Sequence, residues 1–208
     1  MQNLEKTRFI AANYSNLQGL KGVPLGLLLI TVVLWANQLR GRATDLSLPV
    51  LFALVTMVVT FLIYRYYQSH YGKVESPPRK KRVEFLLSAA GGAAALGAFA
   101  GDTYLHLPVS LVGLVFAAAV AAEYLRMQWY APGRYLLPAT LACFAMIAVV
   151  SILPLLGAGA WWMLLGLRAQ LFGVLLVAGA VIVVYGLFGH WYFVRQLPVV
   201  APATKGEG

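Results

Sequence analysis

Charged side chains are scarce in this sequence of 208 residues: they make up 11% of it, whereas apolar residues make up 61%. A soluble domain needs a mostly polar surface, so this composition excludes the one or two soluble domains that the length alone would suggest. The apolar residues come in blocks of about 18 or more, which are typical of transmembrane helices. The sequence therefore predicts an integral membrane protein.

The residue patterns of known intramembrane enzymes are also missing. No Gly-x-Ser occurs, which the nucleophile of a rhomboid-type serine protease would require. Asp45 and Asp102 are the only aspartates, and Phe-Ala-Gly precedes Asp102 where an intramembrane aspartyl protease has Gly-x-Gly. The paired aspartates of head-group transferases and the P-loop of nucleotide-driven proteins are absent too. We therefore expect a protein that is not an enzyme and has no catalytic residues.

Cysteine and histidine are also rare, with one and three residues in the sequence. The single cysteine, Cys143, lies in an apolar block and excludes an intrachain disulfide. His70, His106 and His190 are scattered over both ends of the predicted helices, so we expect no metal, no haem and no other cofactor. Asp102 and His106 face each other across a predicted outer turn, a position typical of interface residues with partial access to water.

The longest polar stretch, residues 68–84, separates two apolar blocks and organises the topology. It contains the cations Arg79, Lys80, Lys81 and Arg82, and such a basic segment stays on the cytoplasmic side of a membrane. Counting outward from it predicts six spans with both termini inside. Thirteen of the sixteen Lys and Arg residues then lie inside and three lie outside. The net charge of +9 is explained by these topology signals, so we expect no nucleic-acid partner.

The predicted fold class is an all-α integral membrane protein: a six-transmembrane-helix bundle, N-in and C-in, with a short N-terminal interfacial amphipathic helix. Residues 1–22 carry apolar side chains at spacings near three and four, which predicts the amphipathic helix; a frayed polar terminus is the alternative. Residues 194–208 contain two prolines and no apolar face, which predicts a disordered cytoplasmic tail. Within the transmembrane domain, residues 23–193, the spans are expected over about 23–38, 49–67, 85–104, 108–126, 136–156 and 169–193.

The third predicted span is the least bulky, since residues 88–101 read SAAGGAAALGAFAG. Small residues let helix backbones approach closely in lipid, where no hydrophobic force drives helices together. We therefore expect Gly97 and Gly101 to pack against Ala118 and Ala122 of the fourth span, at the centre of the bundle.

A candidate polar cluster lies near the inner ends of the even-numbered spans. Arg65, Glu123 and His190 are predicted at similar depth, where a carboxylate facing a cation would offset the desolvation of both. Arg126, three positions after Glu123, can pair with it along the same helix. The alternative is a set of separate side chains that each reach the interface.

Partners and function stay broader than the fold. The four-cation run is expected to contact anionic lipid head groups, at about 1 kcal/mol per cation, unless it only sets orientation during insertion. The expected partners are the lipid bilayer and a membrane protein or second copy, and the expected location is the cytoplasmic membrane of a prokaryote. Two functions remain open: a non-catalytic membrane subunit, assembly factor or regulator acting through helix packing, or a small transporter or channel working as an oligomer or with an energising partner.

Overall fold

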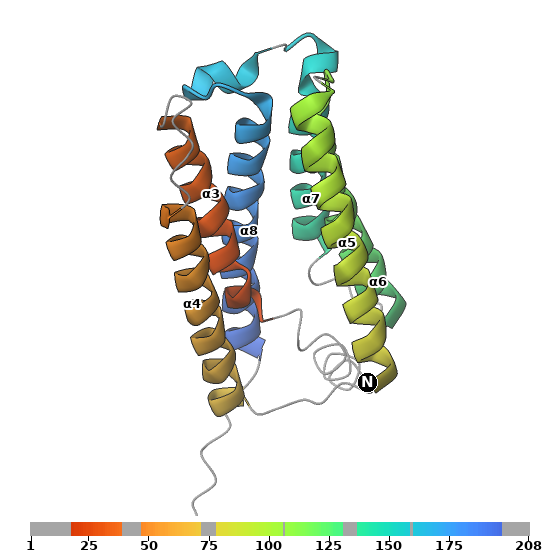
Figure 1. The fold of residues 1–208 in the computed structure, drawn as a ribbon. Coiled ribbons are helices and arrows are strands. Elements are labelled where there is room, and N and C mark those ends of the chain that lie inside the picture. The colour runs from red at the N-terminus through yellow and green to blue at the C-terminus, as the bar shows by residue number, and fades with distance from the viewer. Residues whose placement is uncertain are drawn as a thin grey trace, which may run out of the picture.

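The computed structural model describes residues 18–38, 47–71, 78–105, 107–130, 137–158 and 160–196. Within these ranges the chain forms helices and no strand, which confirms the all-α architecture (Figure 1). The six α-helices are α3 (Val23–Gln38), α4 (Ser47–Tyr71), α5 (Pro78–Tyr104), α6 (Leu111–Tyr130), α7 (Leu137–Ile152) and α8 (Gln170–Gln196). The three short 3-10 helices are η1 (Gly19–Lys21), η2 (Leu153–Leu156) and η3 (Trp161–Leu165).

Most of these helices suit a membrane. Five segments of the described chain are long and apolar enough to cross one: Gly19–Gln38, Ser47–Tyr71, Phe85–Tyr104, Ala139–Leu156 and Gln170–Arg195. The apolar part of α6, Leu111–Leu125, is shorter. The 20 residues of α6, at about 1.5 Å each, still reach about the thickness of a hydrocarbon core. The chain is therefore a multi-pass membrane protein.

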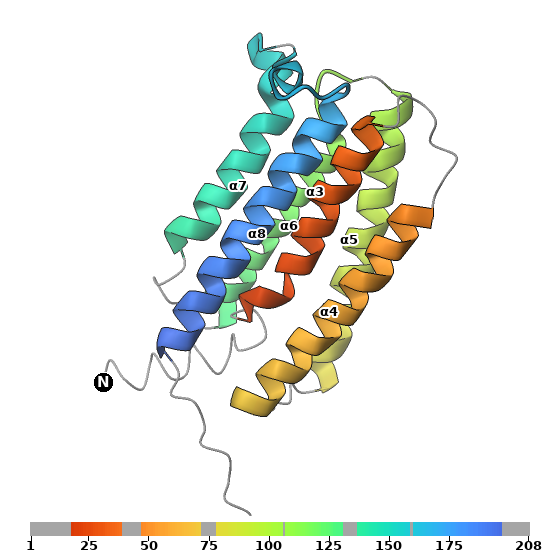
Figure 2. The same cartoon turned by 90° about the vertical axis from the view of Figure 1, so that its left-hand side faces the viewer.

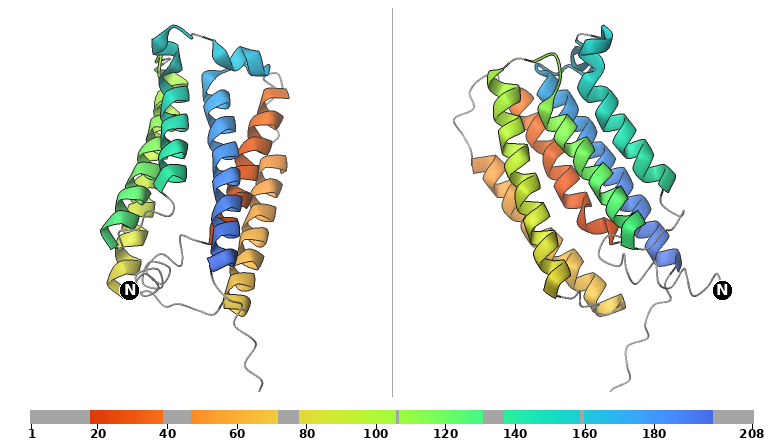
Figure 3. Two further views of the ribbon diagram at one scale, coloured as in Figure 1. Left: turned by 180° about the vertical axis from the view of Figure 1, so that it is seen from behind. Right: turned by 90° about the vertical axis from the view of Figure 1, so that its right-hand side faces the viewer.

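The helices fall into two groups, which α8 joins. α3 and α4 lie with α8 on one side, and α5 lies with α6 and α7 on the other (Figures 1 and 3). α8 packs against α3 in the first group and against α6 and α7 in the second. We call the end of the bundle at Tyr71 and Pro78 the basic end, and the end at Trp161 and Trp162 the tryptophan end.

The polar stretch at residues 68–84 is more helical than the sequence suggested. α4 continues through Tyr71 and α5 already begins at Pro78, before the four-cation run. A proline is well placed in the first turn of a helix, because the N–H that it lacks would have no helical partner there. Lys, Arg and Glu are good helix formers, so nothing breaks the helix where it leaves the apolar region. The polar loop that we expected here is thus largely the ends of two helices.

At the tryptophan end, α7 departs from regular α-helical geometry. α7 changes to the 3-10 helix η2 at Leu153, one residue before Pro154, which cannot donate the next helical hydrogen bond. Gly157 and Gly166, with φ of 89° and 68°, follow η2 and η3 and end them in the left-handed region that glycine adopts without strain.

The closest helix contact in the bundle joins α3 and η1 to α8, the first and last described helices (Figure 2). A Cβ on Gly26 would lie 2.7 Å from the carbonyl oxygen of Gly179, and one on Gly179 would lie 2.8 Å from the carbonyl oxygen of Gly26. Gly19 and Gly186 oppose each other in the same way. Gly19 lies seven residues before Gly26, and Gly186 lies seven residues after Gly179. Two glycine pairs, two helical turns apart, therefore let the antiparallel backbones touch.

The small residues of α5 do not make such a contact within the chain. A Cβ on Gly97 would meet no atom within 4 Å, and Ala118 and Ala122 of α6 are exposed. Only Gly101 is close to α6, where an added Cβ would lie 2.6 Å from Cδ1 of Leu111. α5 contacts α6 on a different face, around the buried Ala98, so the centre of the bundle lies elsewhere than we expected.

The packed core lies between α6, α7 and α8. Ala117, Ile147 and Val181, one from each helix, are buried together. Partly buried apolar side chains surround them: Phe116, Val120, Cys143, Phe144, Ala148 and Val177. This apolar layer has a polar layer on either side of it.

Candidate functional site

The polar cluster expected from the sequence is distributed over separate parts of the bundle. Arg65 on α4 is exposed, and the side chain of Arg126 lies outside the part that the structure describes. His190 on α8 hydrogen-bonds to Tyr67, whereas Glu123 on α6 lies near Tyr185. α4 and α6 belong to different helix groups (Figures 1 and 3).

His190 belongs to an aromatic cluster at the basic end that joins α4 to α8. Tyr67 is completely buried, and its hydroxyl lies 2.7 Å from Nδ1 of His190. The Tyr67 ring packs edge-on against His190 and Phe193, with centroids 5.7 and 5.6 Å apart. Tyr71, one turn further along α4, packs against Phe193 at 5.0 Å.

Glu123 lies in a polar layer whose position follows from the helix register. At Gly113, near the tryptophan end, α6 touches Ser151 of α7 and Val174 of α8. Ten residues from this contact towards the basic end correspond to about 15 Å, at 1.5 Å per residue. This step leads to Glu123 on α6, to residue 141 on the antiparallel α7 and to residue 184 on the parallel α8. The three helices therefore bring Glu123, Thr140 and Tyr185 to one level.

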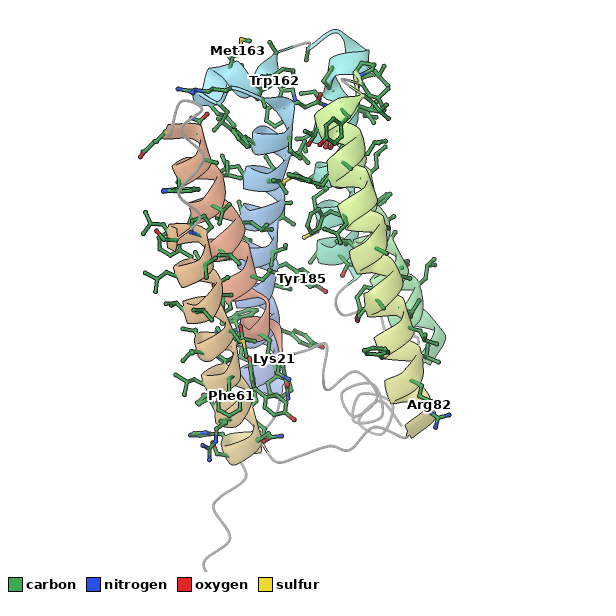
Figure 4. All side chains as sticks on the ribbon, in the orientation of Figure 1. Lys21, Phe61, Arg82, Trp162, Met163 and Tyr185 are labelled. Atoms are coloured by element: carbon green, nitrogen blue, oxygen red, sulfur yellow. The ribbon has the colours of Figure 1, made fainter. Side chains whose placement is uncertain are left out.

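The contacts at this level are polar and cross helix boundaries. Thr140 and Tyr185 share a hydrogen bond of 3.1 Å between their hydroxyl oxygens. Glu123, which is partly buried, lies at the same level on α6. Tyr185 points from α8 toward the group of α5, α6 and α7 (Figure 4). We call Glu123, Thr140 and Tyr185 the inner polar layer, which contains one carboxylate and two hydroxyl groups.

A second polar layer closes the other side of the apolar core, and Asp102 is its centre. The hydroxyl of Ser110 and the backbone N–H groups of Leu111 and Val112 all donate to the Asp102 carboxylate, at 2.7, 2.6 and 3.1 Å. The N–H groups of Leu111 and Val112 belong to the first turn of α6 and have no partner within that helix. The helix dipole favours a carboxylate at this position. Asp102 is therefore the cap of a neighbouring helix. His106, its expected partner, lies outside the described residues.

Ser110 extends this layer to α7 and α8. Its backbone N–H donates to the carbonyl oxygen of Ser151 at 3.0 Å, and the Gln170 amide donates to the same oxygen at 3.3 Å. The Ser110 hydroxyl also accepts the N–H of Gly113 at 3.2 Å, as an N-cap residue does. The network ties α5, α6, α7 and α8 together at the tryptophan end.

The tryptophan end also holds α3 in place. The Asn37 side chain donates to the carbonyl oxygen of Gly166 at 3.0 Å and accepts the N–H of Arg168 at 3.1 Å. Trp161 and Trp162 pack on α8 at Gly173, where an added Cβ would lie 2.8 Å from Trp161 (Figure 4). The segment before α8 is thus attached to both α3 and α8.

The expected lipid-contact residues lie at the basic end. Arg82 is exposed there (Figure 4), whereas the side chains of Arg79, Lys80 and Lys81 fall outside the described part of the chain. Lys21 is also at this end, with its ammonium 4.6 Å above the Tyr64 ring. No group of three or more His, Cys, Asp or Glu among the described residues could hold a metal ion.

Sequence reasoning found Glu123 and His190 but not their neighbours. Thr140, Tyr67 and Tyr185 are common residues of apolar or interfacial helices, and nothing in their spacing indicates which other helix they face. Ser110 did have a signal, because a serine directly before an apolar helical run is typical of an N-cap. The paired glycines of α3 and α8, seven residues apart on both helices, were also visible.

Comparison with known proteins identifies no relative: no protein-family model, no curated protein and no solved structure matches this chain. Its function must therefore be argued from the helices and their contacts.

Proposed function

We propose that this protein is a non-catalytic membrane subunit, assembly factor or regulator that acts through helix packing in the bilayer. The outward face of α5 supports this function best. α5 packs on α6 with Ala98 buried, while Gly97, on another side of the helix, has only open space where a Cβ would be. A second membrane helix could approach this face as closely as α3 approaches α8.

The polar side chains inside the bundle support the same function. Asp102 caps α6, Tyr67 joins α4 to α8, and Thr140 joins α7 to Tyr185 of α8. Each of these groups connects helices of this chain, as expected for a scaffold. The proposed orientation has both termini and the basic end inside, in the cytoplasmic membrane of a prokaryote, in keeping with the thirteen-to-three distribution of cations.

A photo-crosslinking amino acid at Ala93 tests this function in native membranes. Ala93 is exposed and lies one turn from Gly97 on the same face of α5. We expect one discrete protein adduct, whose mass distinguishes a second copy from a different partner. The same crosslinker at Met57, which is 72% exposed on α4, is the control for random collisions and should give no discrete adduct.

The variant Gly97→Leu separates packing between proteins from folding of the chain. Since a Cβ at Gly97 meets nothing within 4 Å, the leucine should abolish the adduct and leave the yield of folded protein unchanged. If Ala93 gives the same smear of products as Met57, or if Gly97→Leu leaves the adduct intact, α5 does not pack against a specific partner.

The inner polar layer favours a second candidate, a small transporter or channel that works as an oligomer or with an energising partner. A carboxylate at membrane depth is costly and is often part of a substrate or ion path. Liposomes that contain only this chain should then show solute flux, and Glu123→Gln should reduce it. Flux that is absent, or equal in the parent and the variant, would leave the subunit as the better function.

A further inference from the structure

α4 and α5 are the least buried of the long helices that the structure describes: none of the most apolar 18-residue window of α4 is buried and 6% of that of α5, compared with 33% for α8. Tyr67 is the only buried residue of α4. α4 packs against α3 and η1, and Tyr67 links it to α8 through a hydrogen bond with His190. Lipid can cover almost the whole of this helix whether it is attached or not.

Several specific contacts of α4 lie at the basic end. Tyr64 lies under the Lys21 ammonium, Tyr67 lies between His190 and Phe193, and Tyr71 lies against Phe193. These three tyrosines follow the i, i+3, i+7 spacing of one helix face. Because exchanging lipid for protein gives no hydrophobic gain in a membrane, such contacts decide whether the helix stays attached.

We propose that α4 is a movable helix held on α8 by a latch made of Tyr67, His190 and Phe193. The latch lies at an end of the bundle that is rich in tyrosine, tryptophan and cations, as membrane interfaces are. There, water and lipid head groups replace the hydrogen-bond partners of Tyr67 and His190 when they separate, so that release is inexpensive. Release uncovers the face of α8 around Phe193, which is 1% exposed with the latch closed.

The remainder of the bundle stays in place when α4 leaves. α3 is fixed to α8 by the paired glycines at one end and by Asn37 at the other. α5 is fixed through Asp102 at the tryptophan end, far from the latch. The inference does not depend on the proposed function, because it concerns a movement within one chain.

Spin-label distances in the full chain in lipid nanodiscs test the latch. In a Cys143→Ser background, one label pair at Ser69 and Val194 reports the distance between α4 and α8. A matched pair at Leu27 and Val184 reports the distance between α3 and α8. All four positions are exposed, so the labels do not disturb buried contacts. Samples are frozen from a series of increasing temperatures below global unfolding.

We expect Tyr67→Phe, which removes one hydroxyl group, to increase the long-distance population of the first pair roughly three- to tenfold, as loss of one such hydrogen bond implies. His190→Leu should act in the same way, whereas His190→Gln, which retains an acceptor, should stay closer to the parent. The second pair should be unchanged in all variants. If the long-distance population of Tyr67→Phe never exceeds that of the parent, or if both pairs widen together, α4 is not held by this latch.

Discussion

Replacing glycine with alanine should affect stability differently at Gly26, in the close contact between α3 and α8, and at Gly97 on α5. Gly26→Ala places a methyl group 2.7 Å from the carbonyl oxygen of Gly179 and 3.1 Å from the backbone nitrogen of Val183. Both neighbours are backbone atoms of a long helix and cannot rotate away. Gly97→Ala places the same methyl group where no atom lies within 4 Å.

The size of the effect follows from these distances. A comfortable carbon–oxygen contact is about 3.3–3.6 Å, so α3 and α8 must separate by roughly 0.6–0.9 Å at Gly26 to accept the methyl group. A gap of about 0.5–1 Å removes a quarter to a half of the dispersion energy of the atoms that it parts. We therefore expect Gly26→Ala to lower the free energy of unfolding by about 1–3 kcal/mol. Gly97→Ala should leave it unchanged or raise it by up to about 1 kcal/mol, because alanine favours the helix more than glycine does.

The assay is unfolding of the purified protein in mild detergent by a rising fraction of SDS, followed by circular dichroism. Both variants differ from the parent by one methyl group in a transmembrane helix, so each is the control for the other. Equal effects at the two sites, or a larger loss at Gly97 than at Gly26, would refute the reasoning and place the close helix contact on α5.

Three further predictions concern the polar layers and the basic end. Asp102→Ala should lower the free energy of unfolding by about 0.5–2 kcal/mol through loss of the α6 cap, and Asn should cost less; SDS unfolding with no loss in either variant would contradict the cap. Changing the four cations at residues 79–82 to Gln should lower the melting temperature in anionic liposomes but not in neutral ones; equal melting in both lipids would leave them as orientation signals alone. Finally, a double-mutant cycle on unfolding should show coupling of about 0.5 kcal/mol or more between Glu123→Gln and Tyr185→Phe, and additivity between Glu123→Gln and Arg65→Gln. The reverse pattern would restore the cluster expected from the sequence.

The sequence predicted the helices well because their main signal, a long apolar run, is local. α3 begins and ends where its apolar block does, at Val23 and Gln38. The ends of α4 and α5 were placed less well, since a helix does not stop where its residues become polar. Pro78 was the better boundary signal, because it suits a first helical turn.

Contacts between helices could not be predicted in the same way. The run around Gly97 is the most evident small-residue pattern in the chain, but α3 and α8 use a sparser pattern in which single glycines recur after seven residues. Prediction of the candidate site was limited in the same way. The depth of Glu123 and His190 along their helices is visible in the sequence, whereas the choice of Tyr185 and Tyr67 as neighbours depends on which helices lie side by side.

Labelling of single cysteines on intact cells tests the predicted topology of six spans with both termini inside. Cysteines at Thr44 and at Ser76 are placed one at a time in a Cys143→Ser background and treated with a membrane-impermeant maleimide. The account predicts labelling at Thr44, and labelling at Ser76 only after the cells are opened. Labelling at Ser76 but not at Thr44 on intact cells would contradict it.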